Sequence, residues 1–332
     1  MAQAKQKPAG GGKGVQDDLP HALAASMPLR AAGFIVTLYG DVVAPRGGEV
    51  WMGSIIAACA RVGISETLVR TAVSRLVAAG QLAGQRVGRR SYYRLTPQAM
   101  AEFDAAAALI YARAPEPRWR FVWLPDGAGP TAPEARNAPS TPEASMAALE
   151  RSGHARLKPQ LALGTDAGPL PPGALGFAAQ PQGDATTLRA FAAAHFDLAA
   201  HARAYDAFIT RFNRFTRARA VPDTGEDALA LRLLLVDDYR RALLRDPRLP
   251  PDALPADWAG HHAARVFAGA YLALSPLADA HVARAWENST VPLTAQPETL
   301  ADRHAALQRL ALGEHHAKAS QNQQQKRLIC DV

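Results

Sequence analysis

Cysteine is scarce in this chain, and its scarcity excludes two classes of protein. Cys59 and Cys330 are the only two thiols in 332 residues, and they lie far apart in the sequence. A small disulfide-stabilised fold or a cysteine-based metal site needs several cysteines at close spacing. Two distant thiols fit a chain that works in a reducing compartment, so we expect the protein to be cytoplasmic.

Long apolar runs are missing too. The sequence contains no stretch of about 18 uncharged, apolar residues, which is roughly the length that crosses a bilayer as a helix. It therefore predicts no membrane span. Residues 1–27 lack the apolar segment of a signal peptide and are rich in glycine, alanine and lysine. We expect them to form a disordered basic arm.

Motifs for catalysis and metal binding are also lacking. The sequence has no HExxH, GxSxG or phosphate-binding loop pattern. Of its ten histidines, His261 and His262 are adjacent, so they would diverge by about 100° on a helix. His195 and His201 are six residues apart, which is a poor chelating step. We therefore expect no enzyme, with no catalytic residue, no metal and no cofactor.

Positive charge is in excess, and most of it lies in one segment. The formal net charge of the chain is +7. Residues 65–95 hold six arginines and one acid, Glu66, so this segment contributes six minus one, or +5. A short segment with this much positive charge indicates a polyanionic partner such as nucleic acid.

Residues 65–79 are predicted to form an amphipathic helix. Ser65 is a good N-cap, and Gly80 is expected to end the helix. One apolar stripe recurs at three- and four-residue spacing and consists of Leu68, Val69, Ala72, Val73, Leu76 and Val77. Four polar residues fall together on the opposite face. We expect these four to contact DNA: Arg70, Thr71, Ser74 and Arg75.

A hairpin is predicted directly after this helix. Residues 81–87 and 91–95 are strand-like runs around the turn Gly88-Arg89-Arg90. Strand alternation should send one of Tyr92 and Tyr93 toward the core and the other outward. The hairpin residues that we assign to DNA, mainly to its phosphates, are Arg86, Arg89, Arg90, Tyr92 and Arg94.

A helix followed by an arginine-tipped ribbon is the layout of a winged helix-turn-helix. The helix can enter the major groove while the wing contacts phosphates or the minor groove. Residues 29–43 and 51–61 predict two preceding helices, and Thr96-Pro97 predicts the start of a following one. Residues 28–113 are therefore assigned to a DNA-binding domain. The alternative is a solvated basic helix and hairpin that bind no partner.

The rest of the chain predicts two further domains and a tail. A strand over 119–124, a helix over 143–151 and an extended run over 156–163 indicate a small α/β sandwich within residues 114–182. A segment rich in proline, alanine and glycine, up to about Pro142, interrupts it, and we expect a flexible loop there.

Residues 183–290 predict a helical domain. Tyr205, Phe208, Phe212 and Phe215 recur at spacings of three, four and three residues, which indicates one buried face. Residues 291–332 are polar and end in a glutamine-rich tail. The fold class expected for the whole chain is α+β.

Several stretches are distinctive as exact sequence. In the N-terminal part these are residues 45–51, 63–76 and 88–96. Later in the chain they are Tyr239-Arg240-Arg241, Arg245-Asp246-Pro247, residues 254–258 and Gly260. In these residues the chain resembles the PaaX-like family of transcriptional repressors of phenylacetate degradation, over roughly residues 29–287.

The resemblance implies a fold and a function. The fold is an N-terminal winged helix, a central ferredoxin-like domain similar to Cas2, and a C-terminal helical domain. The function is a repressor of an aromatic catabolic operon that binds double-stranded operator DNA as a homodimer and is released by an aryl-CoA thioester such as phenylacetyl-CoA. The chain departs from the family in having Asp237 where a histidine is common. Asp126 lies near the place of an acid in Cas2-like nucleases, but a turn role is expected for it.

An effector site is expected in the helical domain. An anionic CoA moiety needs cations, and an aryl group needs an apolar slot. The residues assigned to the effector are Tyr239, Arg240, Arg241, Arg245 and Trp258, with Tyr271 as a further candidate for the slot. The alternative is that the aromatic residues belong to the core and that the arginines cap a helix end.

Two other functions remain open. One is a winged-helix DNA-binding protein with no CoA-ester effector, and the other is an enzyme that acts on acyl-CoA. For the homodimer, the strand over 119–124 and the strand near Leu161 are the candidates for the interface.

Overall fold

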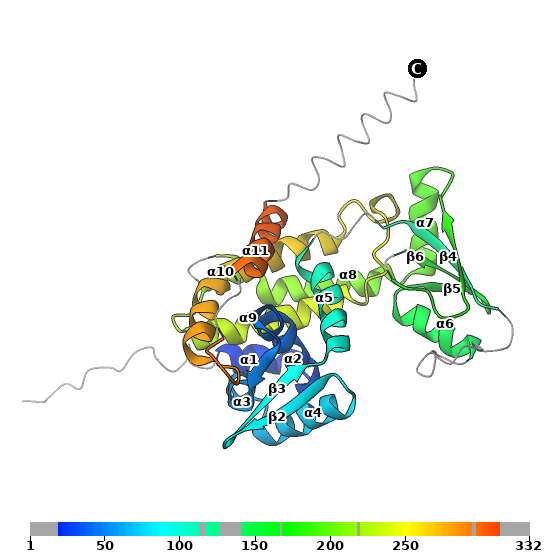
Figure 1. The fold of residues 1–332 in the computed structure, drawn as a ribbon. Helices are drawn as coiled ribbons and strands as arrows, with labels where there is room; N and C mark the ends of the chain where they lie inside the picture. The colour runs from blue at the N-terminus through cyan, green and yellow to red at the C-terminus, as the bar shows by residue number, and fades with distance from the viewer. Residues whose placement is uncertain are drawn as a thin grey trace, which may run out of the picture. The chain divides into compact units, whose positions relative to one another are not determined.

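The computed structural model describes residues 19–112, 117–125, 141–166, 168–217, 220–293 and 297–312 (Figure 1). The expectations for residues 1–18, for the loop that contains Asp126 and for the tail beyond residue 312 lie outside these ranges. Helices predominate within them, and the strands form two small antiparallel sheets. The fold is therefore α+β, as predicted.

Contacts divide the chain into two units that each combine distant segments of sequence. Unit 1 comprises Met1–Phe103, Arg214–Asp237 and Ala270–Leu300. Unit 2 comprises Asp104–Asn213, Asp238–Gly269 and Ala301–Val332. Four helices are divided between the units: α5 (Pro97–Tyr111), α9 (Gly225–Leu243), α10 (Ala259–Ala285) and α11 (Pro297–Ala311).

Unit 1 begins with helices. The elements are α1 (Leu19–Ala25), α2 (Ala31–Leu38), the π-helix η1 (Tyr39–Val43), the 3-10 helix η2 (Ala44–Arg46), α3 (Met52–Ala60) and α4 (Glu66–Ala78). α1 lies inside the segment predicted to be disordered, and the burial of Leu23 and Ala24 explains its order. The helix predicted over residues 29–43 exists, but its last turn widens into η1.

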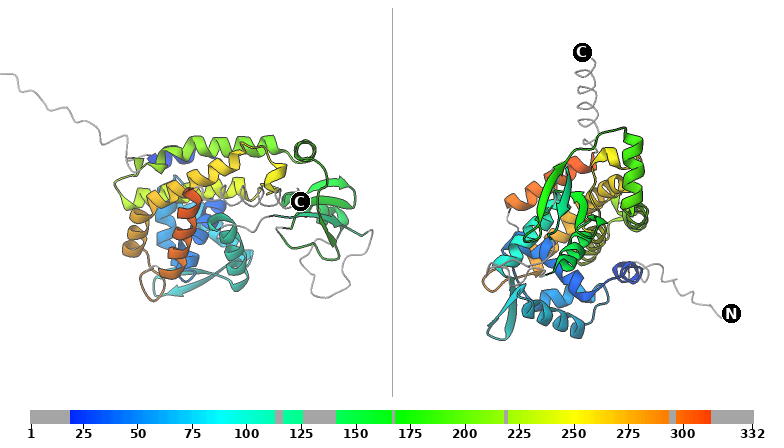
Figure 2. Two further views of the ribbon diagram at one scale, coloured as in Figure 1. Left: turned by 90° about the horizontal axis from the view of Figure 1, so that it is seen from above. Right: turned by 90° about the vertical axis from the view of Figure 1, so that its right-hand side faces the viewer.

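A three-stranded sheet completes the N-terminal part of unit 1. Its strands are β1 (Glu49–Trp51), β2 (Leu82–Val87) and β3 (Arg90–Leu95), in the antiparallel order β1-β3-β2. The helix predicted over 51–61 starts one residue late because Trp51 ends β1. The tip of the β2–β3 hairpin protrudes from the helices around it (Figure 2).

The apolar stripe of α4 is narrower than predicted. Val69, Ala72, Val73 and Leu76 are buried, whereas Leu68 is 56% exposed and Val77 is 38% exposed. At 100° per residue, Leu68 and Val77 fall on opposite edges of the stripe, so both lie at the boundary with solvent. Leu68 and Val77 follow the predicted apolar spacing, but the structure leaves both outside the core.

Unit 2 contains a four-stranded antiparallel sheet. Its elements are β4 (Trp119–Trp123), α6 (Pro142–Arg151), β5 (Ala155–Lys158), β6 (Leu161–Thr165) and β7 (Leu175–Ala179), with strand order β5-β6-β4-β7. Its core consists of Val122, Leu124, Met146, Leu149 and Ala162. The strand and helix predicted first are confirmed. The single extended run over 156–163 is wrong, because two residues of turn split it into β5 and β6.

The remaining elements are mostly helical: α7 (Ala185–His195), α8 (Leu198–Phe212), the 3-10 helices η4 (Asn213–Thr216) and η6 (Pro251–Ala253), and then α9 to α11. The predicted aromatic face is confirmed, since Tyr205, Phe208, Phe212 and Phe215 are all buried. Among the described helices, α10 alone is long and apolar enough to cross a membrane, but half of its most apolar window is buried. A core helix passes the same test.

Candidate nucleic-acid interface

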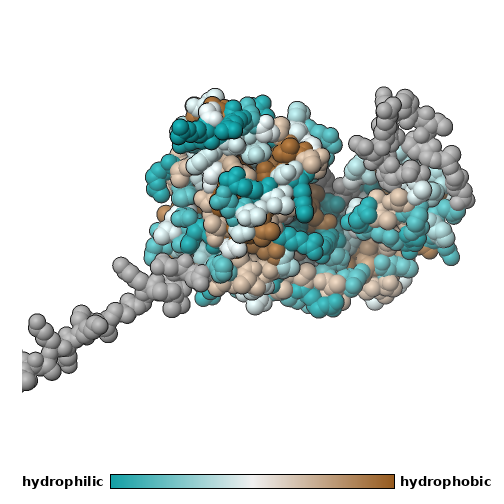
Figure 3. All heavy atoms as spheres, turned by 90° about the horizontal axis from the view of Figure 1, so that it is seen from below, coloured by the Kyte–Doolittle hydropathy of each residue, from teal (hydrophilic) through white to brown (hydrophobic). Residues whose placement is uncertain are grey.

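α4 presents a polar surface that its own local chemistry fixes. Ser65 caps the helix, with its Oγ accepting from the backbone N–H of Leu68 at 3.5 Å. Arg70, Thr71, Ser74 and Arg75 are all exposed on the side opposite the core. Hydrophilic residues are spread over the side of the molecule where α4 and the hairpin lie (Figure 3).

Two side chains on this face have local partners that DNA can replace. Arg70 donates from Nε to Glu66 Oε1 at 2.8 Å, an exposed pair one helical turn apart. Such pairs are weak in water, so the guanidinium remains available to a phosphate. Thr71 donates from Oγ1 to the carbonyl of Thr67 at 2.9 Å. The hydroxyl of Thr71 still has lone pairs that can accept from a base.

The hairpin divides its arginines into two groups. Arg86 and Arg89 are exposed at the tip, where Gly88 adopts φ 60° and Arg86 donates from Nε to the Gly88 carbonyl at 3.2 Å. The turn is shorter than predicted because Arg90 is already in β3. Arg86 and Arg89 are thus exposed hairpin cations at the tip of the turn.

Arg90 and Arg94 contact carboxylates of unit 1. Arg90 pairs with Glu287 and lies over the ring of Trp51, 4.7 Å from its centroid. Arg94 pairs through Nη2 with Oε2 of Glu49 at 3.2 Å. Burial would raise the pKa of Glu49, but hydrogen bonds from Ser289 and Arg94 outweigh burial and lower it. These two arginines brace the sheet as well as facing solvent.

The tyrosines of β3 separate as strand alternation predicts, and this separation corrects one assignment. Tyr92 is 5% exposed, whereas Tyr93 is half-buried and accepts at its carbonyl from the Tyr39 hydroxyl at 3.0 Å. The ring of Tyr92 supports the sheet from inside, which argues against direct contact with DNA. The ring of Tyr93 lies against Gly84, where a Cβ would come within 2.9 Å of it.

Leu68 is a residue of this surface that the sequence pattern placed in the apolar stripe. Leu68, Thr71 and Arg75 lie along one exposed edge of α4, three and four residues apart. Leu68 is 56% exposed, so it adds apolar surface to an otherwise polar face. The sequence offered no signal for this exposure, because Leu68 continues the apolar spacing of the buried stripe.

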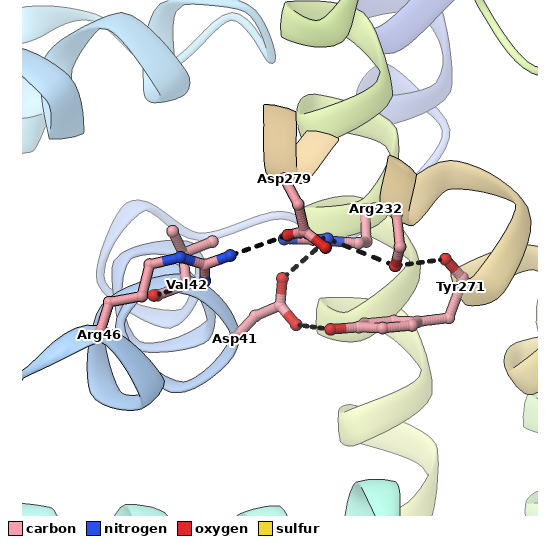
Figure 4. Close-up of polar contacts among 7 residues, drawn as sticks. Asp41, Val42, Arg46, Arg232, Tyr271 and Asp279 are labelled. Atoms are coloured by element: carbon pink, nitrogen blue, oxygen red, sulfur yellow. Dashed lines mark hydrogen bonds and ion pairs between the residues drawn. The ribbon is translucent and has the colours of Figure 1, made fainter. Parts of the chain in front are cut away.

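A buried ionic network fixes the segment that leads into this surface (Figure 4). Arg232 donates from Nε to Asp41 Oδ2 at 2.9 Å and from Nη1 to Asp279 Oδ1 at 2.8 Å. Arg46 also donates to Asp279, at 2.8 Å, and the hydroxyl of Tyr271 donates to Asp41 at 2.8 Å. Two cations and two carboxylates therefore compensate one another within unit 1.

Asp237, the departure from the family pattern, has a structural role in the same unit. Its side chain is 2% exposed and accepts from Thr37 Oγ1 at 2.9 Å. This bond ties α9 to α2. A carboxylate suits this position because the threonine hydroxyl can donate to it.

The residues assigned to the effector differ in burial: the two aromatic rings are buried, and the arginines are half-buried or exposed. Tyr239 and Trp258 are each 5% exposed. Tyr239 stacks on Phe267 with ring centroids 4.2 Å apart, and burial raises the pKa of Tyr239. Trp258 meets Tyr205 edge to face at 6.0 Å. Their burial agrees with the core alternative.

The arginines assigned to the effector lie at the end of α9 and beyond it. Arg240 is half-buried, and Arg241 donates from Nη2 to Asp238 Oδ1 at 3.0 Å. Arg245 is exposed. Tyr271, the further candidate, belongs to unit 1. Among the described residues, no group of three or more histidine, cysteine, aspartate or glutamate side chains is placed to hold a metal ion.

Comparisons with known proteins show what the chain is similar to. Two family models match: PaaX-like protein over residues 30–99, and PaaX-like protein C-terminal domain over residues 196–284. The transcriptional repressor PaaX of Escherichia coli (strain K12) is 32% identical over 306 residues, which cover 83% of this chain and 90% of that protein. Among solved structures, the uncharacterized protein Rv0674 from Mycobacterium tuberculosis is 22% identical with a TM-score of 0.41, covering 69% of this chain and 89% of that one.

Proposed function

The chain belongs to the PaaX-like family of transcriptional regulators, and from this premise we propose that it represses an aromatic, phenylacetate-type catabolic operon by binding double-stranded operator DNA. The observation that carries this proposal is the exposed polar face of α4 beside the arginine-tipped hairpin. A protein with this function works in the cytoplasm as a regulator and needs no cofactor.

The element order supports a winged helix-turn-helix over residues 28–113. α3 and α4 are joined by a short turn at Gly63, and the β2–β3 hairpin follows α4 directly, with β1 as its third strand. In this arrangement α4 enters the major groove and the hairpin lies beside it. Arg70, Thr71, Ser74 and Arg75 then face base edges or nearby phosphates, and Leu68 is placed for contact with a thymine methyl.

Truncation of single arginines should separate base contacts from phosphate contacts. Arg75→Ala should weaken operator binding by about 1–3 kcal/mol and relax specificity at one position. Arg89→Ala should weaken binding to all DNA sequences alike. It should also lower the slope of the logarithm of the binding constant against the logarithm of the salt concentration, the salt slope, by about one. Arg90→Ala should do less, because Glu287 already engages that guanidinium. Fluorescence anisotropy across a salt series measures both quantities.

Arg156→Ala is the matched control, since Arg156 lies in the sheet of unit 2 and pairs with Glu143 and Glu150. It should leave operator binding unchanged. If Arg89→Ala and Arg90→Ala both keep the parent affinity and salt slope, the hairpin is not a DNA-binding wing.

The strand order of unit 2 supports a ferredoxin-like central domain over residues 114–182. A strand, a helix and three further strands with order β5-β6-β4-β7, all antiparallel, match most of that fold. The departure is the connection from β6 to β7, where the described residues form no helix. α7 follows β7 instead.

We propose that this sheet forms the homodimer interface. Trp123 is opposite Leu175 in register, and Phe121 is opposite Phe177, so these side chains share one face. Trp123, Leu175 and Phe177 are 40%, 52% and 54% exposed. An exposed apolar face of this kind favours burial against a second copy, and two copies suit two operator half-sites.

Phe177→Glu is therefore expected to give a monomer in light scattering, because two carboxylates would be buried at the two-fold interface. Leu244→Glu is the control: Leu244 is 39% exposed but lies beyond the sheet. It should remain dimeric. A parent protein that is monomeric both free and on the operator would contradict the dimer.

We propose an aryl-CoA thioester as the effector, with residues 183–290 as its domain and Tyr239, Arg240, Arg241, Arg245 and Trp258 as candidate contacts. The thioester must bind the non-operator conformation more tightly, or it cannot release DNA. A coupling of about 1–3 kcal/mol is enough for a switch. Because the rings of Tyr239 and Trp258 are buried, we expect the thioester to meet the cationic residues first.

Operator affinity with and without phenylacetyl-CoA, in the parent and in Arg240→Ala, tests the whole proposal. Release in the parent that is weakened in Arg240→Ala supports both effector and site. Equal release in both removes Arg240 from the site. Operator binding that no aryl-CoA affects favours the alternative of a DNA-binding protein without this effector, and turnover of acyl-CoA thioesters favours the enzyme.

A further inference from the structure

A cavity of about 270 Å³ lies in unit 2 beside the four-stranded sheet, and none of the residues that line it is among those assigned above to DNA or to the effector. Leu149, Leu170 and two prolines form an apolar wall. His154 and Arg248 lie at its polar end. The cavity therefore combines an apolar body with a cationic end.

His154 is held rigidly in this cavity. Its ring packs over Gly164, where a Cβ would come within 2.4 Å of the ring Cδ2. The Oγ of Ser152 donates to the carbonyl of Leu149 at 2.8 Å and so accepts from His154 Nδ1, 3.1 Å away. His154 is 8% exposed, and its Nε2 has no hydrogen-bond partner among the described residues.

Two guanidinium groups beside His154 have buried donors without acceptors. Nε and Nη1 of Arg248 and Nε and Nη2 of Arg120 have no partner in the part of the chain that the structure describes. Arg120 lies directly opposite Gly164 in the β4–β6 register, under the same histidine ring. Burial, then Arg120 and Arg248, lowers the pKa of His154 to about 4. The positive charges of Arg120 and Arg248 thus both act on the ring of His154.

The loop that carries Arg248 is fixed in a strained conformation. Arg248 has φ 52°, and no other described non-glycine residue has a positive φ. Thr165 donates from Oγ1 to the carbonyl of Pro247 at 3.4 Å, and Gly153 lies so close to Pro247 that a Cβ would come within 2.8 Å of its Cα. Strain of this kind concentrates at binding and catalytic sites.

The neighbouring carboxylate is already engaged. Asp246 accepts from the Tyr205 hydroxyl at 2.7 Å and from the backbone N–H of Arg248 at 2.6 Å. Neither bond involves a guanidinium. The cationic end of the cavity therefore still lacks an acceptor.

We propose that this cavity binds a small organic monocarboxylate. The carboxylate accepts from Arg248, which lines the cavity, and from Arg120, which is not a lining residue but shares the surroundings of Gly176 with the lining residue Leu170. Guanidinium and carboxylate groups have matching paired geometry. The apolar body of the acid lies against Leu149 and Leu170. A bare phosphate would satisfy the arginines but leave the apolar wall empty, and the volume is below that of pockets for larger ligands. The site does not depend on operator binding.

Isothermal titration calorimetry of the full chain tests the site with benzoate and hexanoate as probes. Benzamide is the neutral counterpart of benzoate, and inorganic phosphate is the anion without an apolar body. One of the two acids should bind, and Arg248→Gln and Arg120→Gln should each weaken it about tenfold or more. Arg151→Gln removes an exposed arginine at the end of α6 and should change nothing.

Leu170→Asp keeps the test valid if an arginine variant fails to fold. Leu170 is 38% exposed at the cavity, so an aspartate there should preserve the melting temperature while repelling the acid. The proposal is overturned if neither acid binds the parent, if benzamide binds as well as benzoate, if phosphate binds more tightly, or if Leu170→Asp binds like the parent. Operator affinity of the same preparation keeps a failure of this site separate from a failure of the DNA-binding proposal.

Discussion

Arg232→Met is expected to lower the free energy of unfolding by about 3–5 kcal/mol, as measured by urea unfolding followed by circular dichroism. Arg232 and Asp41 are both essentially inaccessible to solvent. Removing the guanidinium takes away the cation that donates a hydrogen bond to the buried Asp41, and Tyr271 supplies one hydrogen bond to it. The desolvation penalty of Asp41 is then no longer offset.

The opposite charges of the network stabilise one another, which makes the loss large. Burial would lower the pKa of Arg232, but the charge of Asp41, followed by Tyr271 and Asp279, raises it instead. Burial would likewise raise the pKa of Asp279, yet Arg232 and Arg46 lower it. Each charge therefore favours the ionised form of the other, and the variant removes this stabilisation from the carboxylates that remain.

Two variants show whether burial is the cause. Arg156→Met makes the same substitution at an arginine that pairs with two carboxylates at the surface. It should shift the urea midpoint little. The double variant Arg232→Met with Asp41→Leu should recover part of the loss, because both charges are gone. A single Arg232 variant as stable as Arg156→Met would contradict this account.

Local patterns were enough to predict the elements of the candidate DNA-binding surface in outline. The cap at Ser65, the periodicity of α4 and the arginine-rich hairpin depend on residues close in sequence, and the structure has each of them. The errors arose at residues whose burial depends on contacts with distant parts of the chain. Leu68 follows the spacing of a core residue, but its exposure depends on what packs against the edge of α4.

The elements that the sequence did not predict depend on distant partners. β7 lies in a stretch of proline and glycine without alternation, and it becomes a strand because β4 offers it an edge. The pairing of Asp41 with Arg232 joins residues 191 positions apart. Arg120, His154 and Arg248 likewise come from a strand, a turn and a loop that only the fold of unit 2 brings together. No spacing rule predicts such clusters.

Acidification from about pH 6.5 to 4 is expected to destabilise the parent by about 3 kcal/mol through His154 alone. The pKa of His154 is lowered from 6.5 to about 4 in the folded chain. Between these values the unfolded chain binds a proton that the folded chain does not, so protons favour unfolding. The contribution of His154 is therefore fully present above about pH 6.5 and is lost as the pH falls toward 4.

Urea unfolding at a series of pH values gives the free energy of unfolding against pH for the parent and for His154→Gln. The difference between the slopes of these two curves measures the contribution of His154. Glutamine cannot take up a proton, so the variant should lose less stability on acidification. His195→Gln, which replaces an exposed histidine, should keep the slope of the parent. Parallel curves for the parent and His154→Gln would contradict the assigned cause.

A bound carboxylate should change this slope in a definite direction. Part of the lowering of the pKa of His154 comes from Arg120 and Arg248, which repel a proton on the ring. An anion between the two guanidinium groups compensates them, so it raises the pKa of His154 toward its ordinary value and narrows the interval over which acid destabilises the fold. Above about pH 5, where benzoate keeps its charge, saturating benzoate should therefore flatten the pH dependence in the parent and leave that of His154→Gln unchanged. Equal flattening in both would place the acid away from His154.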